Sequence, residues 1–282
     1  MMTTMVQLPA IFRGDRCFAF ATRWMTARPG GKSFWCGVLL GLLFATPGWA
    51  VEQIRLVTKH WPGYTNADLS GGYFELVKLV LPAEQYQINT ELTNFNRAIV
   101  LVQKQQAEFV LAVTRVDGKQ LLLSEFPIDA DTIVAVYRAQ LAPAKTLLQR
   151  ADLPQYRLAW DLAYNYGQAL GLGTTGFEVS SVSQGLELVS KGRVDVYLAE
   201  QAELNDPAAA KLLQQLKLTQ GVVQQLPVYV GFSRSARGLK LKRYWDQQFR
   251  RLMQQGALQD FYQRHPGMVL ATEVPDCAVS IC

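Results

Sequence analysis

Histidine is scarce in this chain of 282 residues, which has only two, His60 and His265. Because most of the chain separates them, neither a histidine-based metal site nor a Ser-His-Asp triad is easily assembled. The sequence also lacks a P-loop and the glycine fingerprint of dinucleotide-binding domains. Carboxylates are plentiful, but none forms a pair typical of acid–base catalysis. We therefore expect a protein that is not an enzyme and that needs neither a metal nor another cofactor.

An excess of one charge is also lacking once the first fifty residues are set aside. The chain has 28 basic and 23 acidic side chains, a net charge of +5. Residues 1–50 hold five of the basic and one of the acidic side chains, which leaves 23 basic and 22 acidic residues in the rest. That balance gives no electrostatic reason to expect a nucleic-acid partner. The composition, 49% hydrophobic and 18% charged, is that of a globular protein.

Long apolar runs are missing except near the N-terminus. Residues 34–45 form a run of twelve apolar residues, fewer than the roughly 20 that cross a bilayer. Basic residues precede the run, and Gly48 and Ala50 place small side chains at the −3 and −1 positions of a cleavage site. We predict that residues 1–50 are a signal peptide cleaved after Ala50, with export to the periplasm. Met25 offers a second start, so we interpret the residues before it as an over-extended N-terminus.

Cysteine is rare as well, and of the four cysteines only Cys277 and Cys282 follow residue 50. In an exported protein, two cysteines with four residues between them can close a small disulfide loop. Two free thiols on a frayed tail are the alternative. We predict the disulfide, as a local staple without a catalytic role, in a C-terminal tail of residues 271–282.

Residues 94–115 combine a helical pattern with a strand pattern. Apolar residues recur at helical spacing over residues 95–102, after an asparagine suited to be the N-cap. Residues 109–113 are then five consecutive apolar residues, which favours a strand buried on both faces, as in a parallel sheet. A helix that leads into such a strand is half of a β-α-β unit. Thr114 and Arg115 follow the strand, at the edge where open α/β sheets bind ligands.

Alternating strands and helices are predicted on both sides of this stretch. Up to residue 113 we expect strands at 54–58, 86–92 and 109–113 and helices at 73–81 and 95–102. After about residue 140 the pattern restarts, with strands at 157–160, 177–182, 194–199 and 221–224 and helices at 166–172, 183–191 and 208–216. A long helix ending at Gly256 and a short one at 257–265 follow.

Two further β-rich runs, at 132–137 and 228–232, bracket the second set of elements. If both cross between two lobes, residues 51–138 and 228–270 form lobe 1 and residues 139–227 form lobe 2. This arrangement is a two-strand hinge, the layout of a binding protein that closes around its ligand. We therefore predict an α/β fold of two lobes joined by two hinge strands.

Seven short motifs follow one another along most of the chain. They are WPGY at 61–64, GGY at 71–73, residues 97–108 (similar to R-A-L-x-x-V-x-x-G-x-A-D), Thr114, LSEFP at 123–127, KGRVD at 191–195, and FSR at 232–234 with QGAL at 255–258. In this order they resemble the extracytoplasmic solute-binding proteins of family 3, which are best known for binding polar amino acids for ABC importers. The resemblance implies the two-lobed type II periplasmic binding protein fold.

The resemblance also implies roles in a ligand site. Amino-acid binders of the family carry an arginine a few residues after the threonine that Thr114 matches, and its planar fork grips the α-carboxylate of the ligand. Here that position is Lys119, which supplies charge without the fork, and Arg115 is the alternative cation. This departure argues against an α-amino acid as the ligand. Glu200 matches the acid with which the family holds an amino group, with glutamate in place of aspartate.

The other candidate site residues lie in loops and at element ends. Trp61 and Tyr64 belong to a loop broken by proline and glycine, where aromatic rings either clamp a ligand or cap the surface. Arg97 lies near a helix N-terminus, where its charge is unfavourable, which suggests an anion, a contact between lobes, or simple solvation. Tyr164 and Asn165 precede a helix start whose free N–H groups attract anions.

We predict a monomeric periplasmic protein that closes around a small polar solute, an amino acid or similar, and delivers it to an inner-membrane ABC permease. The predicted ligand site comprises Trp61, Tyr64, Tyr73, Arg97, Thr114, Arg115 and Lys119 from lobe 1, with Tyr164, Asn165 and Glu200 from lobe 2. Two alternatives remain open. One is a ligand-sensing module for a separate signalling partner, and the other is a periplasmic dehydratase whose cleft acids do general acid–base work.

Overall fold

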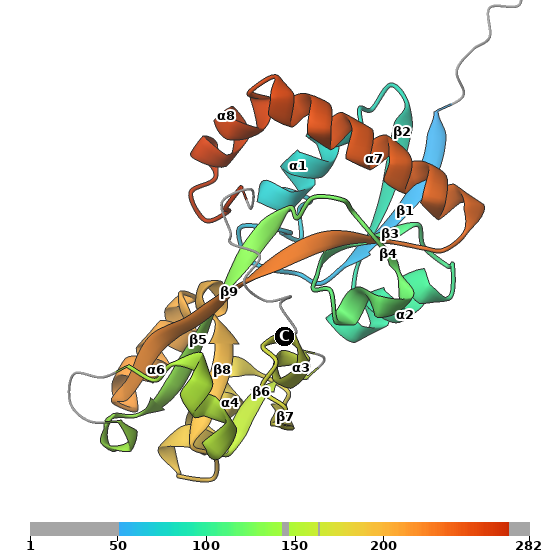
Figure 1. Cartoon of the computed structure of the whole chain (residues 1–282). Helices are drawn as coiled ribbons and strands as arrows, with labels where there is room; N and C mark the ends of the chain where they lie inside the picture. The colour runs from blue at the N-terminus through green and yellow to red at the C-terminus, as the bar shows by residue number, and fades with distance from the viewer. Residues whose placement is uncertain (1–50, 143–146, 163, 271–282) are drawn as a thin grey trace, which may run out of the picture. The chain divides into compact units, whose positions relative to one another are not determined.

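The structure is a computed structural model, and it describes residues 51–142, 147–162 and 164–270 (Figure 1). These residues belong to one compact unit. The predicted signal peptide, the predicted tail and the predicted disulfide between Cys277 and Cys282 lie outside the described residues. Within the described ranges, no helix combines the length and the apolar character needed to cross a membrane.

The first half of the described chain forms three parallel strands with two connecting helices. The strands are β1 (Glu52–Thr58), β2 (Tyr86–Leu92) and β3 (Phe109–Val113), in the order β2-β1-β3, and the helices are α1 (Gly72–Val80) and α2 (Phe95–Gln103). β3 is buried at every residue, as its continuous apolar run predicts. α2 begins where the Asn94 side chain accepts a hydrogen bond from the Arg97 backbone N–H (2.8 Å). The predicted β-α-β-α-β order is therefore confirmed.

Helices cover both faces of this first sheet. The chain moves outward from β1 to β2 and then back past β1 to β3. Right-handed crossovers, the nearly universal kind, then place α1 and α2 on opposite faces. α7 (Ala236–Gln254) packs beside α1, and α8 (Ala257–Arg264) packs against α7. Figure 1 shows α7 beside α1, passing in front of β1 and β2, and α2 on the lower side of the first sheet.

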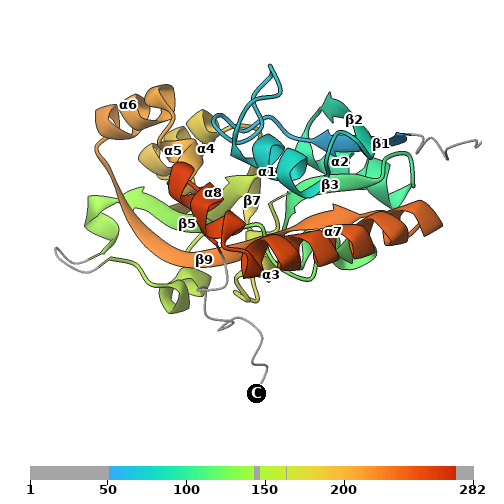
Figure 2. The same cartoon turned by 90° about the horizontal axis from the view of Figure 1, so that it is seen from above.

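One strand, β9 (Leu218–Phe232), passes through both sheets of the molecule. Its C-terminal end pairs antiparallel with β3 and with the short β4 (Leu122–Leu123). The rest pairs with β5 (Asp129–Arg138), from Asp129 opposite Val228 to Arg138 opposite Leu218. Figure 2 shows β9 running on without interruption towards α7.

The prediction of two separate strands at 221–224 and 228–232 is wrong, because β9 continues through Pro227. Proline cannot donate to a ladder and is normally excluded from a central strand. At Pro227, however, β9 pairs only with β5, since its pairing with β3 begins at Tyr229. The strand therefore tolerates the missing donor. β5 and β9 link the two sheets, so the two-lobed α/β fold is confirmed, while the predicted lobe limits stay a prediction.

The second sheet continues from β5 through β8 (Val196–Glu200), β6 (Leu158–Asp161) and β7 (Phe177–Val179). β8 is antiparallel to β5, whereas β6 is parallel to both β8 and β7. Four helices accompany it: α3 (Tyr166–Ala169), α4 (Val182–Ser190), α5 (Gln201–Leu204) and α6 (Pro207–Gln215). α3 is shorter than predicted, since Gly171 follows it with a φ of +64° that glycine adopts readily. The short segments η1 (Asp117–Gln120), η2 (Ala139–Leu141) and η3 (Arg150–Gln155), together with α5, are not predicted from the sequence.

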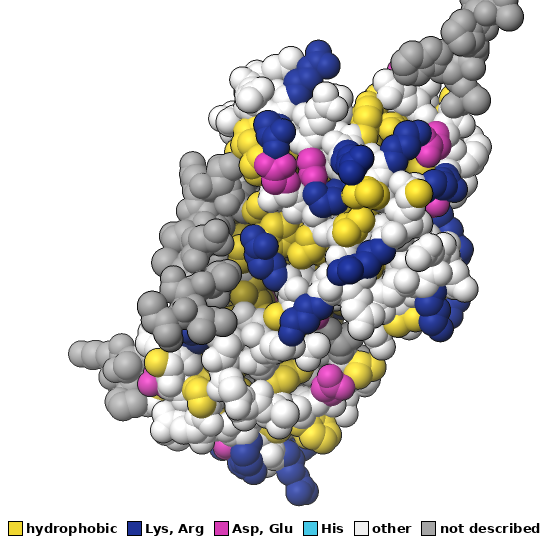
Figure 3. Space-filling view, turned by 45° about the vertical axis from the view of Figure 1, so that its right-hand side comes forward, with side chains coloured by type: hydrophobic (Ala, Val, Ile, Leu, Met, Phe, Trp, Pro, Cys, Tyr) yellow, Lys and Arg dark blue, Asp and Glu magenta, His cyan; other side chains and the backbone are white. Residues whose placement is uncertain are grey.

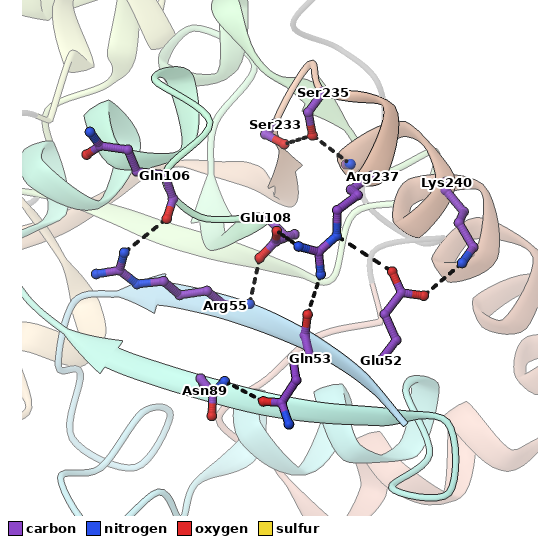
Figure 4. A network of polar contacts seen from close by, with 11 residues as sticks. Glu52, Gln53, Arg55, Asn89, Gln106, Glu108, Ser233, Ser235, Arg237 and Lys240 are labelled. Carbon is purple, nitrogen blue, oxygen red and sulfur yellow. Dashed lines mark hydrogen bonds and ion pairs between the residues drawn. The ribbon is translucent and has the colours of Figure 1, made fainter. Parts of the chain in front are cut away.

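Lysine and arginine side chains are spread singly over the face shown in Figure 3. At the start of α7 such side chains belong to a polar network with β1 and β3 (Figure 4). The Arg237 guanidinium contacts the Gln53 carbonyl and lies 3.1 Å from Glu108 and 3.8 Å from Glu52. Lys240 adds a second contact to Glu52 at 2.8 Å. Each pair is exposed and contributes little alone, but together they hold the helix start against the sheet edge.

Candidate functional site

Two adjoining cavities lie between the loop that follows β1 and the end of β8. The larger has a volume of about 340 Å³ and is lined by Trp61, Pro62, Tyr64, Glu200, Ala202, Glu203, Asn205, Asp206 and Pro207. The smaller, of about 10 Å³, is lined by Trp61, Tyr64, Tyr73, Ala112, Asp131, Tyr164 and Glu200. Because the two share Trp61, Tyr64 and Glu200, they are called here together the cleft.

The loop after β1 is held in one conformation by its own hydrogen bonds. The Thr65 hydroxyl donates to the Lys59 carbonyl (2.7 Å) and accepts from the Trp61 backbone N–H (2.9 Å). Gly63 has a φ of +83°, which glycine adopts without a steric cost. Trp61 is only 7% exposed and packs edge-on against Phe95, with ring centroids 5.6 Å apart. Trp61 is therefore a wall of the cleft and not an aromatic cap on the surface.

The phenol of Tyr164 joins this loop to the second sheet. Its oxygen accepts hydrogen bonds from Lys59 Nζ (3.0 Å) and from the Trp61 indole N–H (3.2 Å), and it donates to Glu203 Oε1 (3.0 Å). Lys59 Nζ also donates to Glu203 Oε1 (2.9 Å). The Tyr164 ring stacks on Tyr166, with centroids 5.4 Å apart. One hydroxyl thus links residues of both lobes directly.

Four carboxylates converge on the same region. Asp129 and Asp131 are alternate residues of β5, so their side chains point to the same face. Glu200 ends β8, the neighbour of β5, and Glu203 lies one turn further on, in α5. Asp129 accepts hydrogen bonds from the Tyr73 hydroxyl (3.1 Å) and from the Val269 N–H (2.8 Å).

Burial keeps three of these carboxyl groups, those of Asp129, Asp131 and Glu200, from ionising freely. It raises the pKa of Asp129 to about 6 against the stabilising effect of its hydrogen bonds. Burial, with the charges of Glu203 and Asp129, raises the pKa of Glu200 to about 8, and Lys59 opposes that shift. Burial and the charge of Glu200 raise the pKa of Asp131 well above its usual range. Clustered acids of this kind mark functional sites more often than structural ones.

Five of the ten predicted site residues meet at the cleft: Trp61, Tyr64, Tyr73, Tyr164 and Glu200. The sequence reasoning missed two others that line it, Asp131 and Glu203, and two that contact its lining residues: Lys59 bonds to Glu203, and Asp129 bonds to Tyr73. The Asp-Ala-Asp pattern at the start of a strand was the available signal, because alternate strand residues share a face. Within the described ranges, no group of three or more His, Cys, Asp or Glu residues is arranged to hold a metal ion.

The structure does not bring the predicted basic residues to the cleft. Arg97 is exposed. Arg115 is exposed too, and its guanidinium carbon lies 4.7 Å from the centre of the Tyr229 ring. The Thr114 hydroxyl donates to Asp117 Oδ2 (2.6 Å) in the turn that begins η1. Their roles in binding stay a prediction.

Lys119 and Asn165 line a different cavity, of about 420 Å³. Its other lining residues include Asn96 and Gln103 of α2 and Glu178 of β7. Lys119 is exposed there, and its carbonyl accepts a hydrogen bond from the Arg234 side chain (3.1 Å). None of the residues lining the cleft lines this second cavity, so Lys119 and Glu200, which were predicted to share one ligand site, line separate cavities. Their roles in binding also stay a prediction.

No model of a known protein family matches the sequence, and no curated protein is similar to it. Solved structures with a similar fold include the substrate-binding protein of an ABC uptake transporter from Streptococcus pneumoniae with bound histidine, at 14% identity and a TM-score of 0.57 over 78% of this chain and 95% of that one. An ancestral arginine-binding protein bound to arginine has 16% identity and a TM-score of 0.54 over 75% and 97%. A histidine kinase sensor domain with similarity to periplasmic binding proteins has 12% identity and a TM-score of 0.58 over 78% and 98%. These likenesses show the fold of the periplasmic binding proteins, as the sequence resemblance predicts.

Proposed function

We propose that this chain is a periplasmic solute-binding protein that closes around a small polar solute. The cleft carries this proposal, because its walls come from both lobes and a single hydroxyl, that of Tyr164, links them. A volume of about 340 Å³ lies at the lower end of the roughly 300–1,000 Å³ that small-molecule sites occupy. The proposal includes export by a signal peptide, a monomeric state, and no catalytic step.

Closure would use β5 and β9 as the hinge. These two strands pair with each other along ten residues of β5 and connect the sheets, so bending them changes the separation of the cleft walls. The Lys59–Glu203 ion pair and the hydrogen bonds at Tyr164 would form only in the closed state. A solute that adds contacts to both walls would favour that state by its differential affinity.

Delivery to an inner-membrane ABC permease is the role that the similarity to transporter-associated binding proteins supports. A thermal-shift screen of the purified protein against amino acids, amines, organic acids and short peptides tests the binding step. A ligand at a hundredfold excess over its Kd stabilises the folded state by about 2.7 kcal/mol, a shift of a few degrees for this size. Small-angle scattering should then show a smaller radius of gyration with that ligand. An unchanged radius at saturation would contradict closure.

A sensing module for a separate signalling partner is the second candidate, supported by the similarity to a histidine kinase sensor domain. Affinity purification from membranes separates the two roles, since a permease should be recovered in the first case and a sensor kinase in the second.

A dehydratase is the third candidate, because a carboxyl group with a pKa of about 8, as at Glu200, can act as a general acid near neutral pH. Turnover of prephenate or arogenate by the purified protein would establish it.

A further inference from the structure

The charged residues that line the cleft are acidic, while Lys59 lies beside the cleft with its ammonium group bound to Glu203 and Tyr164. The charged residues among its described lining are Asp131, Glu200, Glu203 and Asp206, and no lysine or arginine lines either cavity. The Asp206 carboxylate is already used, since it caps α6 by accepting hydrogen bonds from the Ala208 and Ala209 N–H groups. Three carboxylates therefore remain to face a ligand.

These three acids have few partners of their own. No described residue forms a hydrogen bond or an ion pair with Asp131 or Glu200, whereas Glu203 binds Lys59 and Tyr164 through Oε1. Glu203 Oε2 is fully buried and has no hydrogen-bond partner among the described residues. Removing an acid from water without giving it a partner is costly, and this raises the pKa of Asp131 and of Glu200. A positively charged ligand would supply the missing partner.

Aromatic rings form the remaining walls and suit the same kind of ligand. Trp61, Tyr64, Tyr73 and Tyr164 all line the smaller cavity. The chain already holds one ammonium group in this setting. Lys59 Nζ lies 5.0 Å from the Tyr164 ring centre and 5.9 Å from that of Trp61, with Glu203 Oε1 at 2.9 Å. Ring faces and a carboxylate together are the recognised surroundings of an organic cation.

We infer that the solute bound in the cleft is a small organic cation, an amine or a quaternary ammonium compound. It lies in the larger cavity against Glu200, Trp61 and Tyr64, with its positive charge directed at Asp131 and Tyr164 of the adjoining smaller cavity. This inference rests on the proposed binding function. A ligand carboxylate gains no partner here, because it would meet acids of its own sign and no free basic group of the described lining.

Isothermal titration of the purified protein with matched compounds tests the inference. The cations are putrescine and choline, and the counterparts are ornithine, which is putrescine with an α-carboxylate, and succinate. We expect one of the two cations to bind at least tenfold more tightly than ornithine, and succinate not to bind. Tighter binding of ornithine or succinate than of both cations would overturn the inference and leave the proposed function standing. If none of the four compounds binds, that result would count against the inference and against the proposed binding function.

Variants locate the binding cation in the cleft. Glu200→Gln and Asp131→Asn keep the side-chain size and remove the charge, so each should weaken binding of that cation at least tenfold. Neither variant is expected to unfold the protein, because each replaces a buried acid with a neutral group. Glu187→Gln, at an exposed position of α4, is the control and should leave the affinity unchanged. Wild-type affinity in both cleft variants, with unaltered circular dichroism, would overturn the assignment.

Discussion

Lys59 Nζ lies 2.9 Å from Glu203 Oε1, although Lys59 follows the first strand of the first sheet and Glu203 lies on α5, beyond the second sheet. The two side chains are 30% and 13% exposed, so this ion pair is shielded from water more than a surface pair is. It joins the two walls of the cleft. Its strength therefore bears on how readily the two lobes separate.

Lys59→Met should lower the free energy of unfolding by about 1–3 kcal/mol, because the mutation leaves the Glu203 charge half-buried without its cation. Urea denaturation measures this change, and small-angle scattering should show a larger radius of gyration for the empty variant. The control is Lys191→Met, which breaks the Lys191–Glu187 pair, whose side chains are 64% and 51% exposed, and should cost less than about 0.5 kcal/mol. Equal costs for the two variants would refute a special role for the bridge.

Tyr164→Phe should destabilise the closed state by about 1–3 kcal/mol, because three polar groups each lose one hydrogen bond. The Trp61 indole N–H would then be buried without an acceptor. Ligand affinity should fall together with stability, since the same contacts hold both walls of the cleft. Tyr156→Phe is the matched control, because Tyr156 is also partly buried and its hydroxyl forms no hydrogen bond with a described residue. An unaltered affinity in Tyr164→Phe would separate this hydroxyl from binding.

Local patterns predict individual elements well in this chain. β2 at 86–92 and β3 at 109–113 have the predicted limits, because the apolar pattern of each ends at polar or turn residues. The path of β9 could not be predicted in the same way. Its continuation through Pro227 depends on which neighbour lies beside it, and that is a property of the assembled sheets.

Only some of the residues at the cleft were predicted from the sequence, because the others are brought there by the assembly of the two sheets. Aromatic residues in a Pro-Gly loop indicate Trp61 and Tyr64 directly. Proximity to a strand end also suggested Arg115, and the family resemblance suggested Lys119. The turn that Thr114 makes with Asp117 instead carries the chain into η1, and Lys119 lines another cavity. Lys59 and Glu203 are 144 positions apart, so no local sequence pattern indicates that they form an ion pair.

Gly185→Ala should destabilise the protein by about 1–3 kcal/mol, against the expectation from helix propensity. Gly185 lies inside α4, where alanine alone would be favoured by about 1 kcal/mol. A Cβ at this position would lie 2.5 Å from the Tyr197 ring, and Tyr197 is fully buried and hydrogen-bonded to Asp161 (2.6 Å). Overpacking therefore outweighs propensity. Thermal unfolding tests this, and a raised melting temperature would show that α4 can shift away from the sheet.

Glu200→Gln should change how the stability of the empty protein depends on pH. The folded-state pKa of Glu200 is raised to about 8 from an ordinary value of 4.5, so the folded state binds the proton more tightly than the unfolded state does. The stability from this group is complete below pH 4.5 and is lost as pH rises towards 8. The ionisable groups that face Glu200 are Asp129, Asp131, Glu203, Lys59, Tyr64, Tyr73, Tyr164 and Tyr166.

Glutamine carries no such proton, so the melting temperatures of wild type and Glu200→Gln should diverge by several degrees between pH 5 and pH 8, with the variant the more stable at pH 8. Differential scanning calorimetry across this range measures the difference. The melting temperature of Glu187→Gln, a variant at an exposed site, should change with pH in the same way as that of wild type. Parallel curves for Glu200→Gln as well would mean that Glu200 is ionised in the empty cleft at neutral pH. The charge available to an organic cation would then be present before binding, and no proton would be released when the cation enters.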